Sequence, residues 1–164
     1  MRTQHRNGPG RRTCPTTSHV WGTLPVAYQN IPVTVFNATR RGGLATGTAT
    51  ALANRGFVIL STGNATTAVT GVARISFGAA GVGAAYTLAA QIEGATLVFD
   101  ARADTSVDLA LGSEFARLLD PATIILDPAV PLVGAEGCVP LAEAEVQALP
   151  VVVPTEAPAA APAG

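Results

Sequence analysis

The chain has 164 residues, of which 48% are hydrophobic and 13% charged, and its formal net charge is −1. Chains that are disordered throughout combine few apolar residues with a high net charge, so this composition excludes that class. The length leaves no room for two enzyme-sized domains, and we expect one compact domain with flanking segments and a core built mainly from Ala, Val, Leu and Ile.

The first half of that domain is expected to hold a strand, a helix and a second strand. Residues 1–30 are rich in Pro, Gly, Ser and Thr and predict an extended N-terminal arm. Residues 32–37 (PVTVFN) alternate with the period of a strand. Helical spacing begins at Leu44 and ends where Gly56 offers a C-terminal stop. Residues 57–60 (FVIL) predict the second strand, followed by a polar loop, STGNATT.

The second half repeats this order of strand, helix and strand. Residues 73–77 (ARISF) predict a strand that corresponds to the first one, and a helical stripe follows at Val82, Ala85, Ala89 and Ile92. Residues 95–99 (ATLVF) predict the closing strand of this unit. A further strand is expected at residues 107–111, and a final helical turn at residues 115–119.

The order β-α-β-β-α-β-β indicates an α+β fold. We expect a two-layer, ferredoxin-like sandwich over residues 31–119, in which two helices cover one face of a mainly antiparallel sheet. Residues 120–149 carry several prolines and are expected to form a C-terminal arm. Proline recurs every fourth residue in the segment 150–164, which predicts a disordered tail.

The two cysteines are Cys14 and Cys138, one in each predicted arm. Neither has a CxxC partner or a nearby pair of histidines, so the spacing predicts no zinc site and no metal of this kind. A disulfide between them would close a loop of about 125 residues and stabilise the fold by about 5 kcal/mol. Such a bond would imply an oxidising compartment, whereas two unrelated buried thiols are the alternative.

The N-terminus does not match a targeting signal. Residues 1–12 are polar and rich in Arg, but no apolar segment of the length found in signal peptides follows them. No stretch reaches the length of a membrane span. We therefore expect either a cytoplasmic protein or one whose membrane anchor is missing from this chain.

Charge is distributed unevenly along the chain. Residues 1–92 hold eight Arg and no acidic residue, whereas residues 93–164 hold all 11 acidic residues and two Arg. The two parts are thus +8 and −9, a pattern suited to contact with an anionic surface or to self-association. Mutual neutralisation of the two parts across the fold is the alternative.

The strongest candidate for a binding site is the sequence Arg40-Arg41-Gly42-Gly43. It falls in the first strand-to-helix turn, where free backbone N–H groups and the helix dipole favour anions. Arginine adds forked, permanently charged donors suited to phosphate or carboxylate. The loop therefore predicts contact with a phosphorylated or acidic polymer, and ordinary solvated arginines are the alternative.

The second glycine-rich turn imitates a dinucleotide-binding motif. Gly78, Gly81 and Gly83 precede the second helix, and Asp100 follows about 20 residues after the first glycine. The order is G-x-x-G-x-G in place of G-x-G-x-x-G, and the unit stands second in the domain. Close packing between helix and sheet explains the glycines without a nucleotide.

The sequence gives little evidence for calcium binding, hydrolysis or nucleic-acid binding. Asp100, Arg102, Asp104 and Asp108 lack the spacing of a calcium loop, so local pairing between Arg and Asp is expected. The only histidines lie in the N-terminal arm, and there is no G-x-S-x-G motif, which argues against hydrolysis. The chain has no Lys and no basic residues interleaved with aromatic ones, so we expect no nucleic-acid partner.

The stretch IPVTVFNATRRGGLATGTATALANRGFVILSTGNA, followed by ARISFGAAG and TLVFDARADTSVDLALGSEF, resembles the LytR C-terminal domain (LytR_C) of actinobacterial envelope proteins. The resemblance covers about residues 31–119. Domains of this family end LytR-CpsA-Psr proteins, whose separate catalytic domain transfers glycopolymers to peptidoglycan, and they also occur alone behind a membrane anchor.

The resemblance implies a non-enzymatic protein without a cofactor on the outer side of the cytoplasmic membrane. It would contribute to wall integrity by binding a glycopolymer or an envelope protein partner. Its association with the membrane would require the anchor that this chain does not show. A nucleotide-binding protein that uses Gly78 to Asp100, and a structural module that self-associates, remain as alternatives.

Overall fold

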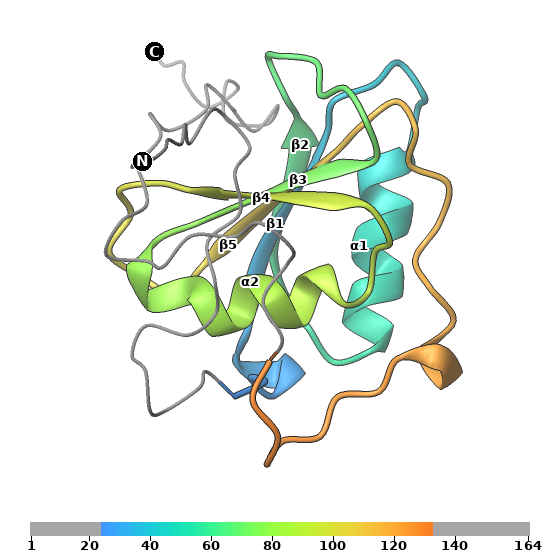
Figure 1. Cartoon of the computed structure of the whole chain (residues 1–164). Helices are drawn as coiled ribbons and strands as arrows, with labels where there is room; N and C mark the ends of the chain where they lie inside the picture. The colour runs from blue at the N-terminus through green and yellow to red at the C-terminus, as the bar shows by residue number, and fades with distance from the viewer. Residues whose placement is uncertain (1–23, 133–164) are drawn as a thin grey trace, which may run out of the picture.

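The computed structural model describes residues 24–132 (Figure 1). The strands are β1 (Pro32–Asn37), β2 (Val58–Asn64), β3 (Ala73–Phe77), β4 (Ala95–Phe99) and β5 (Val107–Leu111), and the helices are α1 (Leu44–Asn54) and α2 (Val82–Ala89). Short 3-10 helices lie at η1 (Tyr28–Asn30), η2 (Ala79–Gly81) and η3 (Pro121–Thr123). The predicted order β-α-β-β-α-β-β and the α+β content are confirmed.

The five strands form one mixed sheet in the order β2-β1-β5-β3-β4. β1 pairs in parallel with both β2 and β5, and β3 pairs in parallel with β4. The only antiparallel pair of the described sheet joins β3 to β5. The predicted mainly antiparallel, ferredoxin-like sheet is therefore wrong, because each helix connects strands that pair directly and β5 enters between the two units.

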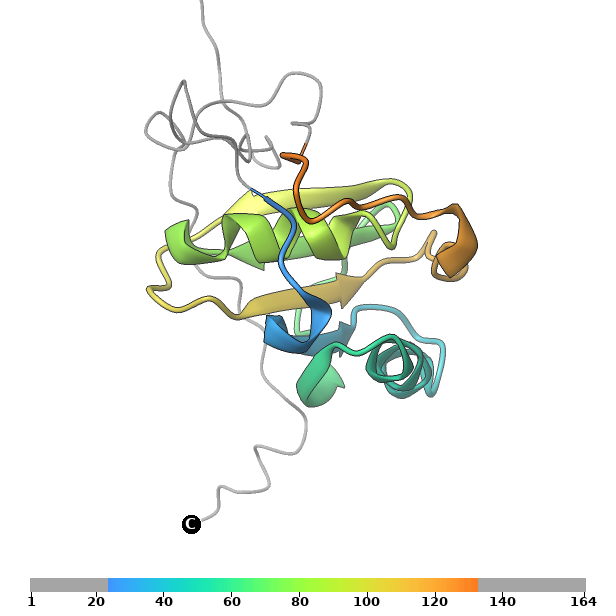
Figure 2. The ribbon, with the colours of Figure 1, turned by 90° about the horizontal axis from the view of Figure 1, so that it is seen from below.

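Both helices lie on the same side of the sheet (Figure 2). A crossover between parallel strands is right-handed in nearly all proteins. Two such units that run in opposite directions place their helices on one face when they also progress in opposite directions across the sheet. The arrangement of β1-α1-β2 and β3-α2-β4 on either side of β5 satisfies this condition.

The main core lies between the helices and the sheet. Its buried side chains alternate along each inner strand, as in Val33 and Val35 of β1 or Val107 and Leu109 of β5, as expected for a half-covered sheet. Small residues of α1 and α2 allow both helices to lie close to the sheet. Phe77 is the largest fully buried side chain of the described residues. The opposite face carries a smaller cluster of Phe36, Ala38, Val69 and Ala110.

Local differences from the predictions occur where tertiary contacts dominate. The polar residues 61–64 continue β2 because they pair with β1, and are not a loop. Residues 115–119 form no helical turn. Gly56 ends α1 as predicted, with a φ of 109° that favours glycine.

Part of the predicted N-terminal arm packs on the domain. Tyr28 stacks on Phe57 with ring centroids 4.5 Å apart. The Tyr28 hydroxyl also accepts a hydrogen bond from the buried Gln91, whose side-chain oxygen accepts one from Arg55. Arg55 donates in addition to the Leu119 carbonyl at 2.6 Å. This network joins η1, both helix ends and the segment after β5.

Candidate functional site

The loop between β1 and α1 is held by the side chain of Asn37. Its carbonyl oxygen accepts hydrogen bonds from the backbone N–H and the hydroxyl of Thr39, at 2.9 and 2.7 Å. Its amide nitrogen donates to the Arg41 carbonyl at 2.6 Å. Because Asn37 is buried at the end of β1, these bonds fix the loop to the rigid sheet.

Gly43 completes this turn and begins α1. Its φ of 77° lies in the left-handed region that glycine adopts without strain. No side chain caps the helix at this end, so the first backbone N–H groups of α1 have no side-chain acceptor at the N-cap. The predicted glycines thus lie at the start of α1, and the binding of an anion at this turn stays a prediction.

The two arginines of the loop have different roles. One Nη of Arg41 donates to the Phe115 carbonyl at 2.6 Å and approaches the Gly112 carbonyl at 3.5 Å, which ties the loop to the segment after β5. Arg40 is exposed and makes no hydrogen bond or ion pair within residues 24–132. Only Arg40 is therefore available to a ligand without loss of an internal contact.

A groove of about 490 Å³ lies between α1 and the segment that follows β5. We call it the α1 groove. It is lined by Gly42, Gly43, Leu44, Gly47, Thr48, Ala51, Arg55, Phe115, Ala116, Arg117 and Leu118. The sequence did not predict that Arg117 belongs here. It is exposed, like Arg40, and makes no hydrogen bond or ion pair with the described residues.

The second strand-to-helix turn is closed by the protein itself. A Cβ atom at Gly78 would overlap the carbonyl of Arg102, and one at Gly81 would lie 3.3 Å from the carbonyl of Thr105. The backbone of the segment between β4 and β5 thus occupies the space next to the glycines. A pyrophosphate group has no room there, which argues against the nucleotide alternative.

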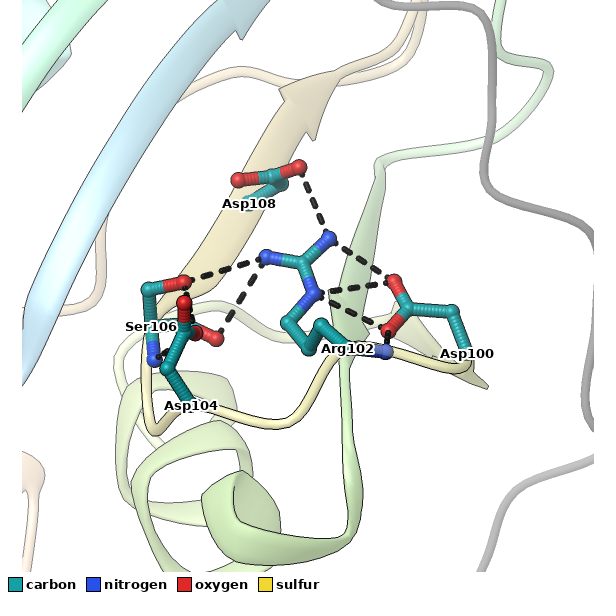
Figure 3. A network of polar contacts seen from close by, with 5 residues as sticks. All are labelled: Asp100, Arg102, Asp104, Ser106 and Asp108. Atoms are coloured by element: carbon teal, nitrogen blue, oxygen red, sulfur yellow. Dashed lines mark hydrogen bonds and ion pairs between the residues drawn. The ribbon is translucent and has the colours of Figure 1, made fainter.

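An ion-pair network holds that segment in place (Figure 3). Arg102 contacts Asp100 at 2.7 Å and Asp108 at 2.9 Å, so the predicted pairing between Arg and Asp is confirmed. Asp104 accepts hydrogen bonds from the hydroxyl and the backbone N–H of Ser106, at 2.6 and 3.0 Å. Asp100 is therefore engaged within the protein.

Two pKa values in this network are displaced. Burial by itself lowers the pKa of Arg102, but the hydrogen bonds and charges of Asp108 and Asp100 outweigh it and raise the pKa above the ordinary arginine value. The hydrogen bonds from the Ser106 side chain and backbone lower the pKa of the exposed Asp104. Both shifts favour the charged forms, as in a structural network.

Two further expectations concern the ends of the chain. Cys14 and Cys138 lie outside the described residues. Neither helix in residues 24–132 is long and apolar enough to span a bilayer. The same residues bring no three His, Cys, Asp or Glu side chains together in a metal-binding arrangement.

Comparison with known proteins identifies the family. Residues 30–115 match the LytR_C family, described as LytR cell envelope-related transcriptional attenuator. The chain belongs to this family. The matched range includes the whole sheet, the loop with Arg40 and the two strand-to-helix turns.

A curated relative is the cell envelope integrity protein Cei of Mycobacterium tuberculosis, 39% identical over 98 residues. The match covers 57% of this chain and 45% of Cei, so the chain spans less than half of that relative. A solved structure with a TM-score of 0.54 and 31% identity is the soluble domain of a conserved hypothetical secreted protein from Mycobacterium marinum, covering 66% of this chain and 81% of that one. These relatives support an envelope-associated function and agree with an extracytoplasmic location.

Proposed function

We propose that this protein is a non-catalytic component of the extracytoplasmic envelope that contributes to wall integrity by binding an anionic wall glycopolymer along the α1 groove. The family and its envelope relatives support the cellular setting. The observation that carries the proposed ligand is a pair of exposed arginines that have no hydrogen bond or ion pair within residues 24–132. Arg117 lines the groove, and Arg40 lies in the loop two residues before the lining residue Gly42.

The α1 groove and the loop before it each have a role in this proposal. Arg40 and Arg117 supply charged, forked donors for phosphate or carboxylate groups of the polymer. Gly42 and Gly43 let the polymer approach the backbone because neither position has an atom within 4 Å of a Cβ. Arg41 acts indirectly, since its bond to the Phe115 carbonyl keeps both walls of the groove in register.

The lining of the α1 groove favours binding over catalysis. Among the described residues that line it, Thr48 supplies the only side-chain hydroxyl, and none is His, Asp or Glu. Hydrolysis or transfer would need a nucleophile with a base within hydrogen-bond reach. The groove thus offers cations and backbone donors to an anion, but no general base for a reaction on it.

The proposal is tested by sedimentation with purified wall glycopolymer at low and high salt. Arg40→Glu and Arg117→Glu are each expected to weaken binding by at least about tenfold, since opposite charge is replaced by like charge. Arg40→Lys keeps the charge and is the matched control, with a loss of only a few-fold. Arg41 is unsuitable for this test because its substitution would also disturb the loop.

Unchanged binding by Arg40→Glu and Arg117→Glu, with unchanged melting temperatures, would remove the α1 groove as the polymer site. Retention of an envelope protein by the wild-type chain, without binding of any wall polymer, would replace the polymer by a protein partner. Turnover of the polymer during the assay would contradict the non-catalytic role.

A further inference from the structure

The segment after β5 is tied to both ends of α1. Before the start of the helix, Arg41 donates a hydrogen bond to the Phe115 carbonyl at 2.6 Å. At the C-terminal end of the helix, the C-cap residue Arg55 donates to the Leu119 carbonyl at 2.6 Å. Arg117 lies midway in sequence between these two carbonyls and lines the α1 groove. The two bonds therefore hold both ends of the short stretch that carries this exposed arginine.

The bond from Arg55 is supported by Gln91, whose side chain is buried with 0% exposure. The side-chain oxygen of Gln91 accepts a hydrogen bond from Arg55 at 2.8 Å. The backbone carbonyl of Gln91 accepts one from the Leu119 N–H, also at 2.8 Å. Arg55 and Gln91 together thus fix both backbone polar groups of Leu119.

Tyr28 of η1 determines which way the Gln91 amide faces. The amide oxygen accepts and the amide nitrogen donates, whereas a guanidinium group only donates. The oxygen must therefore face Arg55, and the buried nitrogen needs an acceptor elsewhere. The Tyr28 hydroxyl accepts from this nitrogen at 3.0 Å, and no other described residue does so. Loss of the hydroxyl would leave a buried donor unpaired, which favours a rearrangement of the amide.

We infer that Tyr28 is a positioning residue of the α1 groove, although it does not line the groove. It acts through Gln91 and Arg55 on the segment that carries Arg117. A segment that is already held loses less conformational freedom when a ligand binds, so the cost of binding is lower. The effect on binding rests on the proposed function, whereas the effect on the segment can be measured without a polymer.

Tyr28→Phe is the variant of choice, because it keeps the ring that stacks on Phe57 and removes only the hydroxyl. Backbone ¹⁵N relaxation of the full chain without polymer measures the order of the segment. The order parameters of amides 116–118 are expected to fall from about 0.85 toward about 0.6. Thr87→Val is the matched control, since it removes the acceptor of the Val26 N–H and should leave these amides unchanged. Unchanged order parameters in Tyr28→Phe would overturn the inference.

Sedimentation with purified wall glycopolymer tests the effect on binding. Tyr28→Phe is expected to weaken binding by about fivefold. In an Arg117→Ala background the same substitution should cause no further loss, because the residue through which it acts is gone, whereas a general loss of stability would cause an additive effect.

Unchanged binding by Tyr28→Phe, an additive loss in the Arg117→Ala background, or an equal loss in Thr87→Val would each overturn the inference. A wild-type chain that binds no wall polymer would instead remove the proposed function. The order parameters would in that case still decide whether Tyr28 holds the segment.

Discussion

The two strand-to-helix turns of this domain have similar sequences but differ in what lies next to their glycines. In the first, Asn37 holds the loop, Arg40 is exposed, and α1 begins without a side-chain cap. In the second, the backbone of Arg102 and Thr105 lies directly on Gly78 and Gly81. The first turn leaves Gly42 and Gly43 uncovered, whereas in the second turn the protein's own backbone covers Gly78 and Gly81.

A glycine-rich turn alone therefore does not predict a ligand, because the neighbouring segment decides whether the turn is open. The segment after β4 crosses over the second turn, where Arg102 is fixed by Asp100 and Asp108. The segment after β5 runs beside the first turn but leaves the α1 groove between them. Four predictions test this distinction.

The largest effect is expected from Arg102→Ala. The substitution leaves the side chain of Asp100, which is 0% exposed, without its cationic partner. Loss of one member of a buried ion pair costs about 3 kcal/mol, and we expect a loss of that size in the free energy of unfolding in urea. Arg117→Ala, at an exposed arginine that makes no ion pair with the described residues, is the control and should change this free energy by less than about 0.5 kcal/mol. Equal effects of the two substitutions would contradict the structural role of the network.

The glycines of the two turns give a matched pair. Gly78→Ala is expected to destabilise the fold by about 2 kcal/mol, because the new Cβ overlaps backbone atoms of Arg102 that cannot move without the segment. Gly42→Ala has no atom within 4 Å of the new Cβ and should shift stability by less than about 0.5 kcal/mol. Thermal unfolding of both variants measures the contrast. If Gly78→Ala is tolerated as well as Gly42→Ala, the second turn is not closed.

The neighbouring arginines of the first loop should separate stability from binding. Arg41→Ala removes the bond to the Phe115 carbonyl and is expected to cost about 1 kcal/mol, a value reduced by solvent exposure. Arg40→Ala should leave the free energy of unfolding unchanged and weaken polymer binding. Urea unfolding and polymer sedimentation of the two variants measure both quantities. A stability loss in Arg40→Ala would show that this residue has an internal role.

The smallest effect concerns the pKa of Asp104. Hydrogen bonds from Ser106 lower this pKa. Their contribution to stability is therefore fully present at pH values above the ordinary carboxyl pKa, and it is lost as the pH falls through the lowered pKa. Ser106→Ala removes the hydroxyl donor and should move the pKa of Asp104 back toward its ordinary value. An NMR titration of the carboxyl group in both proteins measures the change, and an identical pKa would exclude the hydroxyl as its cause.

Local elements could be predicted from the sequence because they depend on short-range patterns. The alternation in residues 32–37 and 107–111 predicted β1 and β5, and Gly56 marked the end of α1. Their pairing could not be predicted, because alternation shows which residues face the core and not which strand lies next. The position of β5 between β1 and β3 is a property of the whole sheet.

The candidate site could be predicted only in part for the same reason. The Arg-Arg-Gly-Gly motif located the loop, since a strand, glycines and a helix follow each other in the sequence. Arg41 bonds to the segment after β5, and Arg117 lines the α1 groove as part of that segment. This segment lies more than 70 positions after the loop in the sequence. No local signal at either arginine distinguishes a side chain bonded within the protein from a free donor.

The most direct test of the account is an NMR titration of the labelled chain with a soluble fragment of purified wall glycopolymer. We expect the largest changes in amide shifts at residues 40–48 and 115–118, with little change at residues 78–82 and 100–106. The reverse pattern, or no change at residues 40–48 under conditions in which the polymer binds, would contradict the claim that the open first turn is the binding surface.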